Sequence, residues 1–149
     1  MAVENKSEKK VHLRILTPTA TKVDEEVDTV IMRCLNGDMG VLPGHETYIC
    51  ILADGVLRMI DRRRERRIAV FGGVVEIKDD VVTVLTEEAH WPGDIDRDRA
   101  EEAKEHLQRR IQEKTDDQEL LRDEVLLRRA LMKIEVSGFT ADNEPDEEA

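Results

Sequence analysis

The sequence predicts a protein of class β+α, with an N-terminal antiparallel β-sandwich followed by a C-terminal antiparallel α-helical hairpin. Val, Ile and Thr make up 26 of the 78 residues from 11 to 88, but only 6 of the 42 residues from 95 to 136. Short apolar segments separated by glycine turns fill the first part, whereas no Gly or Pro occurs between residues 94 and 137. Because β-branched residues favour strands and uninterrupted Ala, Leu, Glu and Lys favour helices, we expect the architecture to change at Trp91-Pro92-Gly93.

The chain is expected to divide into four regions. A disordered N-terminus over 1–10 precedes a β-sandwich over 11–90, and a helical hairpin over 91–138 precedes an acidic disordered tail over 139–149. The two terminal segments are polar and charged, so they cannot bury enough apolar surface to offset the entropy of ordering. A length of 149 residues suits one small domain with an appendage.

Alternating apolar and polar residues predict the strands of the sandwich. Val11, Leu13 and Ile15 alternate with His12 and Arg14, which indicates a strand with one buried face. Further strands are expected at 27–34, 48–53, 55–60, 67–71, 73–77 and 81–86. The segments between them hold glycines, paired aspartates or the charged run 61–66, which suit turns. Short strands spaced about 8 to 12 residues apart predict a sandwich or a flattened barrel.

The most specific local signal is the turn Leu42-Pro43-Gly44-His45. Proline fixes φ at the second position of a turn, and glycine accepts the positive φ of the third position, as a type II turn requires. The turn determines where Asp38 and His45 point. Taken alone, the turn favours an ordinary surface turn.

Two helices are expected after residue 94. Asp94 and Asp96 are candidates for capping the first helix, which carries a thin apolar stripe of Ala100, Ala103, Leu107 and Ile111. The segment Thr115-Asp116-Asp117 interrupts the pattern, and Asp116 with Glu119 fits a capping box for a second helix. The second stripe is wider and consists of Leu120, Leu121, Val125, Leu126, Leu127, Ala130, Leu131 and Ile134. The short interruption predicts an antiparallel pair.

The helical pair is expected to be held only weakly by the β-sandwich. Helices of this length are marginal in water without tertiary packing, and the first helix offers few apolar atoms to bury. At roughly 0.8 kcal/mol per buried methylene, docking contributes only a few kcal/mol before the ordering entropy is subtracted. An equilibrium so close to balance can be shifted by one ligand or one partner.

Composition and motifs exclude several classes of function. A net charge of −11 argues against general nucleic-acid binding, which needs a basic face. Cys34 and Cys50 lack the spacing of a zinc or redox motif and are expected to be buried thiols. The four histidines are scattered, and there is no glycine-rich phosphate loop or nucleophile elbow, so we expect no catalytic and no metal-binding residues. No apolar run approaches the ~18 residues of a membrane span, and the charged N-terminus is unlike a secretory signal.

Four segments, in this order, resemble the ε subunit of the bacterial rotary proton-translocating ATP synthase. They are Gly37-Asp38-Met39-Gly40-Val41-Leu42-Pro43-Gly44-His45, Phe71-Gly72-Gly73-Val74-Val75-Glu76-Ile77, Val81-Val82-Thr83-Val84-Leu85, and Ile95-Asp96-Arg97-Asp98-Arg99-Ala100-Glu101-Glu102-Ala103-Lys104. The resemblance covers the chain from Val11 to about Val136. It implies a non-catalytic rotor subunit of the central stalk, which links the γ subunit to the membrane c ring. In that family the helical hairpin either folds against the sandwich or extends along γ and restrains ATP hydrolysis.

The resemblance also implies partners and a location. The expected partners are the γ subunit, the c-subunit ring, and the α and β subunits, with membrane contact only through the complex. The expected location is the cytoplasmic face of the bacterial inner membrane, as a peripheral protein. By the turn motif, Asp38 matches a position that approaches the c ring and His45 a position that faces γ. The competing hypothesis is a free-standing cytosolic adaptor or holdase-like module that uses the helices as a client arm.

A nucleotide site is implied at the start of the first helix. Ile95, Asp96, Arg99 and Ala100 resemble the segment with which some family members bind ATP, and Arg129 and Lys133 match basic positions that close the site. Two residues depart from the pattern, because Lys133 lacks the planar fork of arginine and His90 stands where ATP-binding members carry glutamate. No cofactor is required in this reading, and ATP is a regulatory ligand. The alternative is a capped helix start with Asp96 as N-cap and Arg99 as solvated surface.

Basic residues supply two further hypotheses. Arg122, Arg128 and Arg129 match an inhibitory basic face that meets an acidic segment of the catalytic β subunit in the family, although the same residues suit a solvated helix surface. The run Arg62-Arg63-Arg64-Glu65-Arg66-Arg67 is the strongest basic cluster of the chain. It suits either contact with anionic lipid headgroups or the exposed tip of a hairpin, and the sequence leaves both open.

Overall fold

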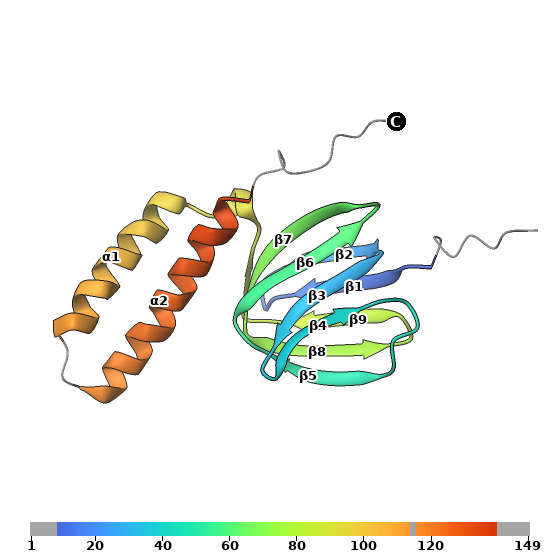
Figure 1. Cartoon of the computed structure of the whole chain (residues 1–149), viewed down its shortest axis with the longest axis horizontal. Coiled ribbons are helices and arrows are strands. Elements are labelled where there is room, and N and C mark those ends of the chain that lie inside the picture. Colours follow the sequence, from blue (N-terminus) through green and yellow to red (C-terminus); the bar gives the residue numbers. More distant parts are fainter. Residues whose placement is uncertain (1–8, 114–115, 140–149) are drawn as a thin grey trace, which may run out of the picture.

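The computed structural model describes residues 9–113 and 116–139, which form a β-sandwich with a pair of helices beside it (Figure 1). The ten strands are β1 (Val11–Leu16), β2 (Thr21–Val27), β3 (Thr29–Cys34), β4 (Gly37–Val41), β5 (Tyr48–Leu52), β6 (Gly55–Asp61), β7 (Arg64–Phe71), β8 (Gly73–Lys78), β9 (Val81–Leu85) and β10 (Glu88–His90). They are followed by a short 3-10 turn η2 (Pro92–Asp94), then α1 (Arg97–Glu113) and α2 (Asp117–Ser137). The predicted fold class is therefore confirmed. The predicted disordered segments 1–10 and 139–149 lie almost entirely outside the described residues.

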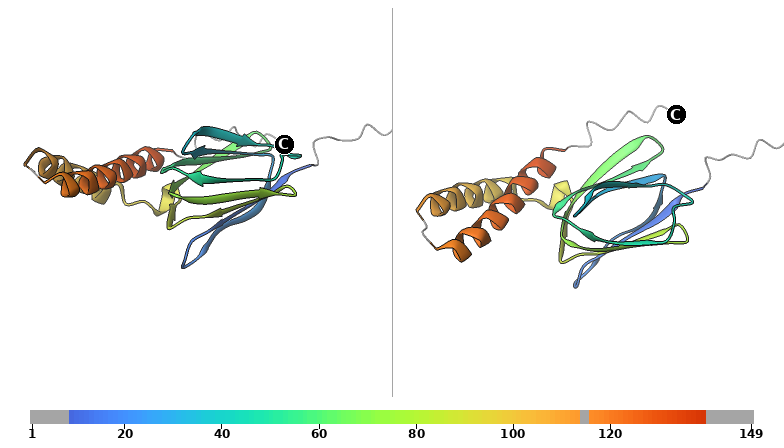
Figure 2. Two further views of the ribbon diagram at one scale, coloured as in Figure 1. Left: turned by 90° about the horizontal axis from the view of Figure 1, so that it is seen from below. Right: turned by 60° about the horizontal axis from the view of Figure 1, so that its bottom comes forward.

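The strands form one sheet that curls into a flattened barrel, in the order β10-β7-β6-β3-β5-β8-β9-β1-β2, with β4 paired to β3 (Figure 2). The two halves of the sheet join where β3 meets β5 through the single registered pair Cys34 and Leu52. Its far ends approach each other through an ion pair between Arg66 of β7 and Glu25 of β2. The expectation of a wholly antiparallel sheet is wrong at one pair, because β1 lies parallel to β9, from His12 opposite Val81 to Leu16 opposite Leu85. Strand β1 pairs with β2 on one side. Its other side pairs with β9, which the chain reaches only after it has passed through the rest of the sandwich.

Three strands were not expected, and one expected strand is divided. Strands β2, β4 and β10 are absent from the predicted set, and the expected strand 27–34 splits at Asp28 into the end of β2 and the whole of β3. The charged run 61–66 is not simply a turn, because β6 extends to Asp61 and β7 begins at Arg64. Only Arg62 and Arg63 form the turn, with φ of 51° and 67°. Arg58 donates to Glu65 diagonally across this hairpin, at 2.7 Å, so charged residues are compatible with strand pairing.

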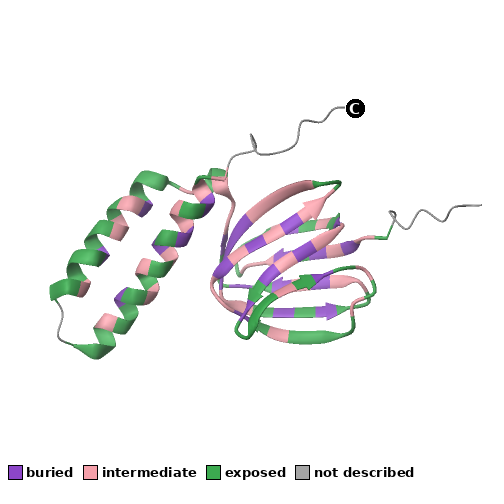
Figure 3. Cartoon of the chain, viewed as in Figure 1, coloured by how far each residue is buried: buried purple, intermediate pink, exposed green. Residues whose placement is uncertain are grey.

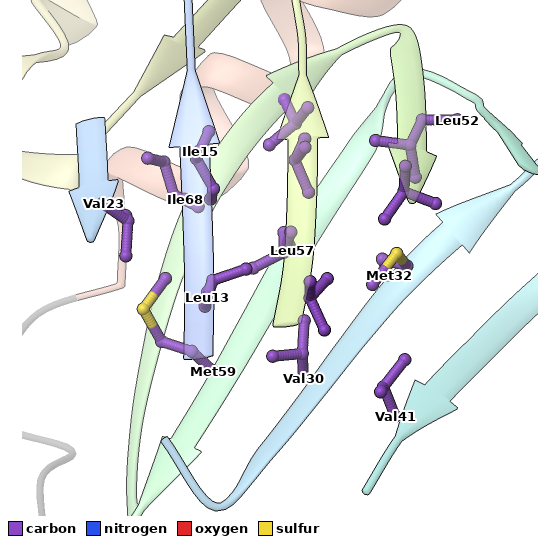
Figure 4. Packing of buried hydrophobic residues seen from close by; sticks show 14 of the residues in the cluster. Leu13, Ile15, Val23, Val30, Met32, Val41, Leu52, Leu57, Met59 and Ile68 are labelled. Carbon is purple, nitrogen blue, oxygen red and sulfur yellow. The ribbon is translucent and has the colours of Figure 1, made fainter. Parts of the chain in front are cut away.

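The interior of the sandwich is filled by aliphatic side chains, which alternate with more exposed residues along β1, β3, β6, β8 and β9 (Figure 3). Figure 4 shows Leu13 and Ile15 of β1 packed toward side chains from the other strands, including Val30, Leu57 and Met59. Cys34 is buried and Cys50 is half-buried, and both are free thiols. Trp91 packs against the edge of this core. The sandwich thus has its own continuous core, separate from the helices.

Gly44 and Gly73 have positive φ values that would strain any other residue. Gly44 has φ +86° in the turn that follows β4, and the His45 N–H donates to the carbonyl of Leu42 at 3.3 Å, which confirms the predicted type II turn. Gly73 has φ +124° at the start of β8, and a Cβ built there would lie 2.0 Å from the Leu85 carbonyl oxygen. The close approach of β8 and β9 at this point therefore requires glycine.

The two helices begin at capped residues and pack against each other as an antiparallel pair (Figure 1). The carboxylate of Asp96 accepts the Arg99 N–H at 3.2 Å, and that of Asp116 accepts the Gln118 N–H at 3.1 Å, which confirms both as N-caps. Asp94 lies in η2 instead. Asp123 of α2 is 1% exposed between the helices, and its carboxylate lies 3.4 Å from Nε of Arg110 on α1.

The apolar stripe predicted for the second helix is partly wrong. Leu121, Leu126 and Leu131 are exposed, whereas Ala130, Met132 and Val136 are buried. The stripe assumed one contact face, but α2 contacts both α1 and the sandwich, and Met132 and Val136 belong to the second contact.

Substitution of Gly73 by alanine is expected to destabilise the sandwich. The added methyl group would meet backbone atoms of Leu85, and the positive φ would strain any L-residue, so the free energy of unfolding should fall by at least about 2 kcal/mol. Urea unfolding followed by circular dichroism measures the change. Gly40→Ala is the matched control, because nothing lies within 4 Å of its Cβ position, and it should unfold close to the parent. Equal stability of both variants would contradict the close approach at Gly73.

Candidate functional site

A cleft of about 570 Å³ opens between the helical pair and the end of the sandwich. It is lined by residues from β10, η2, α1 and α2, namely Glu88, His90, Asp94, Ile95, Asp96, Arg99, Ala100, Ala103, His106, Leu107, Leu126, Arg129, Ala130 and Lys133. All six residues predicted for the nucleotide site lie in this lining. Residues 95–100 and 129–133, far apart in the sequence, are brought together because α2 returns antiparallel along α1.

Each wall of the cleft has a distinct character. Ile95 and Asp96 lie in the link from η2 to α1, and Arg99 and Ala100 lie in the first turn of α1. The side chain of Asp96 holds the first turn of the helix through the Arg99 N–H, so the start of α1 is fixed in place. Ala100 and Ala130 are buried and small, which leaves room between the helices for a ligand. The arrangement combines an apolar floor with charged groups at the rim, as ligand sites commonly do.

The cations on α2 are already engaged with the sandwich. Nε of Arg129 lies 3.2 Å from the carboxylate of Asp54, and the Arg129 guanidinium carbon lies 5.4 Å from the Phe71 ring centre. The ammonium of Lys133 lies 5.5 Å from the same ring centre. Phe71 is 1% exposed and clusters with Ala69, Met132 and Val136. The basic groups that line the cleft are therefore also part of the attachment of α2.

A carboxylate that the sequence interpretation did not include lies in the cleft. His90 Nε2 lies 3.0 Å from the carboxylate of Glu88, and the His90 ring is tilted against Phe71 at 5.7 Å. The hydrogen bond from His90 lowers the pKa of Glu88, and the charges of Lys133 and Arg129 act in the same direction against partial desolvation. Glu88 thus supplies a carboxylate two residues before the position at which glutamate was missing. The short strand β10 was not predicted, so no local pattern indicated that Glu88 lies in this cleft.

The remaining predicted residues lie away from the cleft, with one exception. Arg122 and Arg128 are exposed on α2, whereas Arg129 turns toward Asp54, so the three do not form one accessible face. Asp38 of β4 forms an exposed ion pair with Arg33, at 3.1 Å. His45 follows the type II turn and its ring contacts that of Tyr48, with centroids 6.5 Å apart.

Several arginines of the basic cluster at 62–67 form contacts within the chain. Arg66 pairs with Glu25 and its guanidinium lies 5.7 Å from the Trp91 ring centre. Arg67 donates to Glu65 at 2.8 Å and lies 4.6 Å from the ring centre of Phe139. In this run only Arg62 and Arg63, at the hairpin tip, are exposed. Their exposure favours the hairpin-tip interpretation over a lipid-binding cluster.

No helix in the described segments 9–113 and 116–139 is long and apolar enough to cross a membrane. Within the same segments, no group of three or more His, Cys, Asp or Glu side chains is placed to hold a metal ion.

Comparison with known proteins gives matches over nearly the whole chain. The family described as ATP synthase, Delta/Epsilon chain, beta-sandwich domain matches residues 10–92, and the long alpha-helix domain of the same family matches residues 94–138. The ATP synthase epsilon chain of Halalkalibacterium halodurans is 36% identical over 129 residues, covering 86% of this chain and 97% of the relative. Those of Bacillus subtilis and Nitratidesulfovibrio vulgaris are 36% and 37% identical, with 87% and 88% of this chain covered and 98% of each relative.

Solved structures agree with this assignment. A chain of the Euglena gracilis mitochondrial ATP synthase, described as OSCP/F1/c-ring in rotational state 1, aligns with a TM-score of 0.73 and 26% identity over 85% of this chain and 79% of that one. A chain from the central stalk and c ring of the Tetrahymena thermophila mitochondrial ATP synthase shares the fold, with a TM-score of 0.52 and 11% identity over 61% of this chain and 73% of that one. The β-sandwich, the helical pair and the sequence identity across both together show that the chain belongs to the ATP synthase delta/epsilon family, as a non-catalytic subunit of the epsilon type.

Proposed function

We propose that this chain is a regulatory subunit whose helical pair is released from or held against the sandwich according to the occupancy of the cleft by ATP. The observation that carries the proposal is that one cleft gathers Ile95, Asp96, Arg99, Ala100, Arg129 and Lys133. A ligand in this cleft contacts both helices and the end of the sandwich at once. Binding therefore favours the docked hairpin, because a ligand stabilises the conformation that holds its site together.

The chemistry of the lining suits a nucleoside triphosphate. Asp96 retains acceptor capacity beyond the Arg99 N–H and can accept from an adenine amino group, while the apolar floor near Ala100 takes the base. Arg99 and Arg129 offer planar guanidinium groups for bidentate bonds to phosphate oxygens. Lys133 contributes a point charge without that directional fork. In this proposal ATP acts as an effector that is bound and not hydrolysed.

Two carboxylates act as internal competitors for the phosphates. Asp54 holds Arg129 at 3.2 Å, and the hydrogen bond from His90, followed by the charges of Lys133 and Arg129, stabilises the negative charge of Glu88. In the empty cleft these carboxylates neutralise the cations and keep α2 on the sandwich. Phosphate groups must displace them or share the cations with them, which weakens nucleotide binding and makes the docked form accessible without nucleotide. This competition sets the ATP concentration above which the cleft is occupied.

Membership of the family supports a proposal for the position in the complex. We propose that the sandwich joins the γ subunit to the c ring at the cytoplasmic face of the membrane, with Asp38 toward the ring and His45 toward γ. Both residues lie in the segment that contains the type II turn at Gly44, and Gly44 donates its N–H to Asp80 at 2.7 Å. When α2 leaves the sandwich, Arg129 is freed from Asp54 and joins Arg122 and Arg128 as a basic surface for an acidic segment of the catalytic β subunit. The extended hairpin then restrains hydrolysis.

Arg99→Ala is expected to weaken ATP binding by at least about tenfold, because it removes a charge-assisted contact to phosphate. Isothermal titration of the isolated chain with ATP measures the affinity. Arg128→Ala is the matched control, since Arg128 is exposed on α2 outside the cleft lining, and it should bind as the parent does. Unchanged affinity in Arg99→Ala, or equal weakening in both variants, would contradict a nucleotide site in this cleft.

Acid is expected to weaken the docking of the hairpin through Glu88. The folded-state pKa of Glu88 lies below its ordinary value, so its stabilising contribution is present above the unfolded-state pKa and is lost as the pH falls through the lower, folded-state pKa. In the parent, the thermal midpoint at which the helical pair unfolds should fall as the pH is lowered. In Glu88→Gln this fall should be smaller. Glu87→Gln is the control, because Glu87 is exposed and does not line the cleft. Identical acid profiles of parent and Glu88→Gln would show that this carboxylate does not support docking.

A further inference from the structure

Two cysteines lie in direct contact at the junction of the two halves of the sheet. Sγ of Cys34 on β3 and Sγ of Cys50 on β5 are 2.9 Å apart, and both residues are free thiols. Cys34 is 3% exposed, whereas Cys50 is half-buried. The two strands that carry these cysteines, β3 and β5, share only one registered pair, Cys34 with Leu52. Neither thiol belongs to the cleft or to the proposed rotor contacts.

We propose that Cys34 and Cys50 form an oxidation site, at which a two-electron oxidant of the peroxide class converts the thiol pair into an intramolecular disulfide. The sulfur atoms need to approach only from 2.9 Å to the ~2.05 Å of a disulfide bond. This is a small displacement for side chains at the end of β3 and in the middle of β5. The inference rests on the geometry of the thiols and not on the proposed nucleotide site.

The two thiols have different roles in the reaction. Cys50 is the more accessible, so its sulfur attacks hydrogen peroxide, the O–O bond breaks, and the products are a sulfenic acid and water. The sulfur of Cys34 then attacks the sulfenic sulfur, the S–S bond forms, and the departing hydroxide takes the Cys34 proton to give a second water. Two thiols and one peroxide therefore give one disulfide and two waters. Burial, followed by the contact with Cys50, raises the pKa of Cys34 to about 12, so closure is expected to be slow at neutral pH and faster in alkali.

The disulfide would enclose the segment most relevant to coupling. Residues 35–49 lie between the two cysteines and contain β4, Asp38, the type II turn and His45 (Figure 1). At present the base of this segment is held by the hydrogen bonds Leu35 N–H to Ile51 O, at 3.1 Å, and Ala53 N–H to Arg33 O, at 3.0 Å. A covalent bond there restricts the unfolded chain and prevents β3 and β5 from separating. Oxidation thus stiffens the segment that carries Asp38 and His45.

The test treats the folded full-length chain with hydrogen peroxide and then maps its peptides without reduction. The expected result is a Cys34–Cys50 crosslinked peptide, an intact mass lower by two hydrogens, and a thermal midpoint raised by about 5 to 10 °C. Dithiothreitol should restore the parent mass and midpoint. Cys50→Ser should show neither the crosslinked peptide nor the rise in thermal midpoint. In Cys34→Ser the reaction should stop at an oxidised, uncrosslinked Cys50.

Several results would overturn the proposal. They are free alkylation of both cysteines after peroxide treatment, disulfides only between chains, or formation of the crosslink only in urea. Because Cys34 is buried and Cys34→Ser can disturb folding, Cys50→Ser at the half-buried position is the deciding variant. A rise in its thermal midpoint equal to that of the parent would assign the effect to another group.

Discussion

The helical pair is attached to the sandwich around one aromatic ring, that of Phe71. Met132 and Val136 pack on one side of the cluster, and Arg129 and Lys133 lie 5.4 and 5.5 Å from the ring centre. Burial of two such aliphatic side chains contributes about 3 to 6 kcal/mol at most. Each cation over the ring adds about 0.5 to 1 kcal/mol, and a partly exposed ion pair such as Arg129 with Asp54 adds about 0 to 1 kcal/mol. These gains are opposed by the entropy of fixing the pair in one position, so we expect the docked form to be only slightly favoured.

In the proposed function, a weak attachment of this kind lets the cleft control the hairpin. The same residues, Arg129 and Lys133, hold α2 to the sandwich and line the cleft. A ligand there competes with Asp54 and Glu88 but also connects α1, α2 and the link after η2. For the proposed nucleotide, linkage makes the effect reciprocal, because a nucleotide that stabilises docking does so by the same free energy with which docking improves its affinity. By contrast, the sandwich has a separate aliphatic core that remains when the helices leave.

The sequence predicted the features that local chemistry determines. The type II turn at Gly44 and the caps at Asp96 and Asp116 follow from backbone requirements that few residues satisfy, and all three are present. Strands β2 and β10 were missed because their stability comes from pairing with neighbours; β2, with only two buried valines, looks too polar when taken alone. The roles of Met132, Val136, Asp54 and Glu88 depend on how α2 lies against β7 and β10. That arrangement joins residues distant in sequence and has no local signal.

Native-state hydrogen exchange on the full-length chain tests the weak attachment of the hairpin most directly. The account predicts that the amides of α2 from Leu126 to Val136 exchange through an opening a few kcal/mol above the native state, well below the global unfolding that exposes β1, β6 and β9. Phe71→Leu should lower the α2 opening energy further while the sandwich strands stay protected. If α2 instead exchanges only together with those strands, at the global unfolding energy, the hairpin is a fixed part of the sandwich and the regulatory account is wrong.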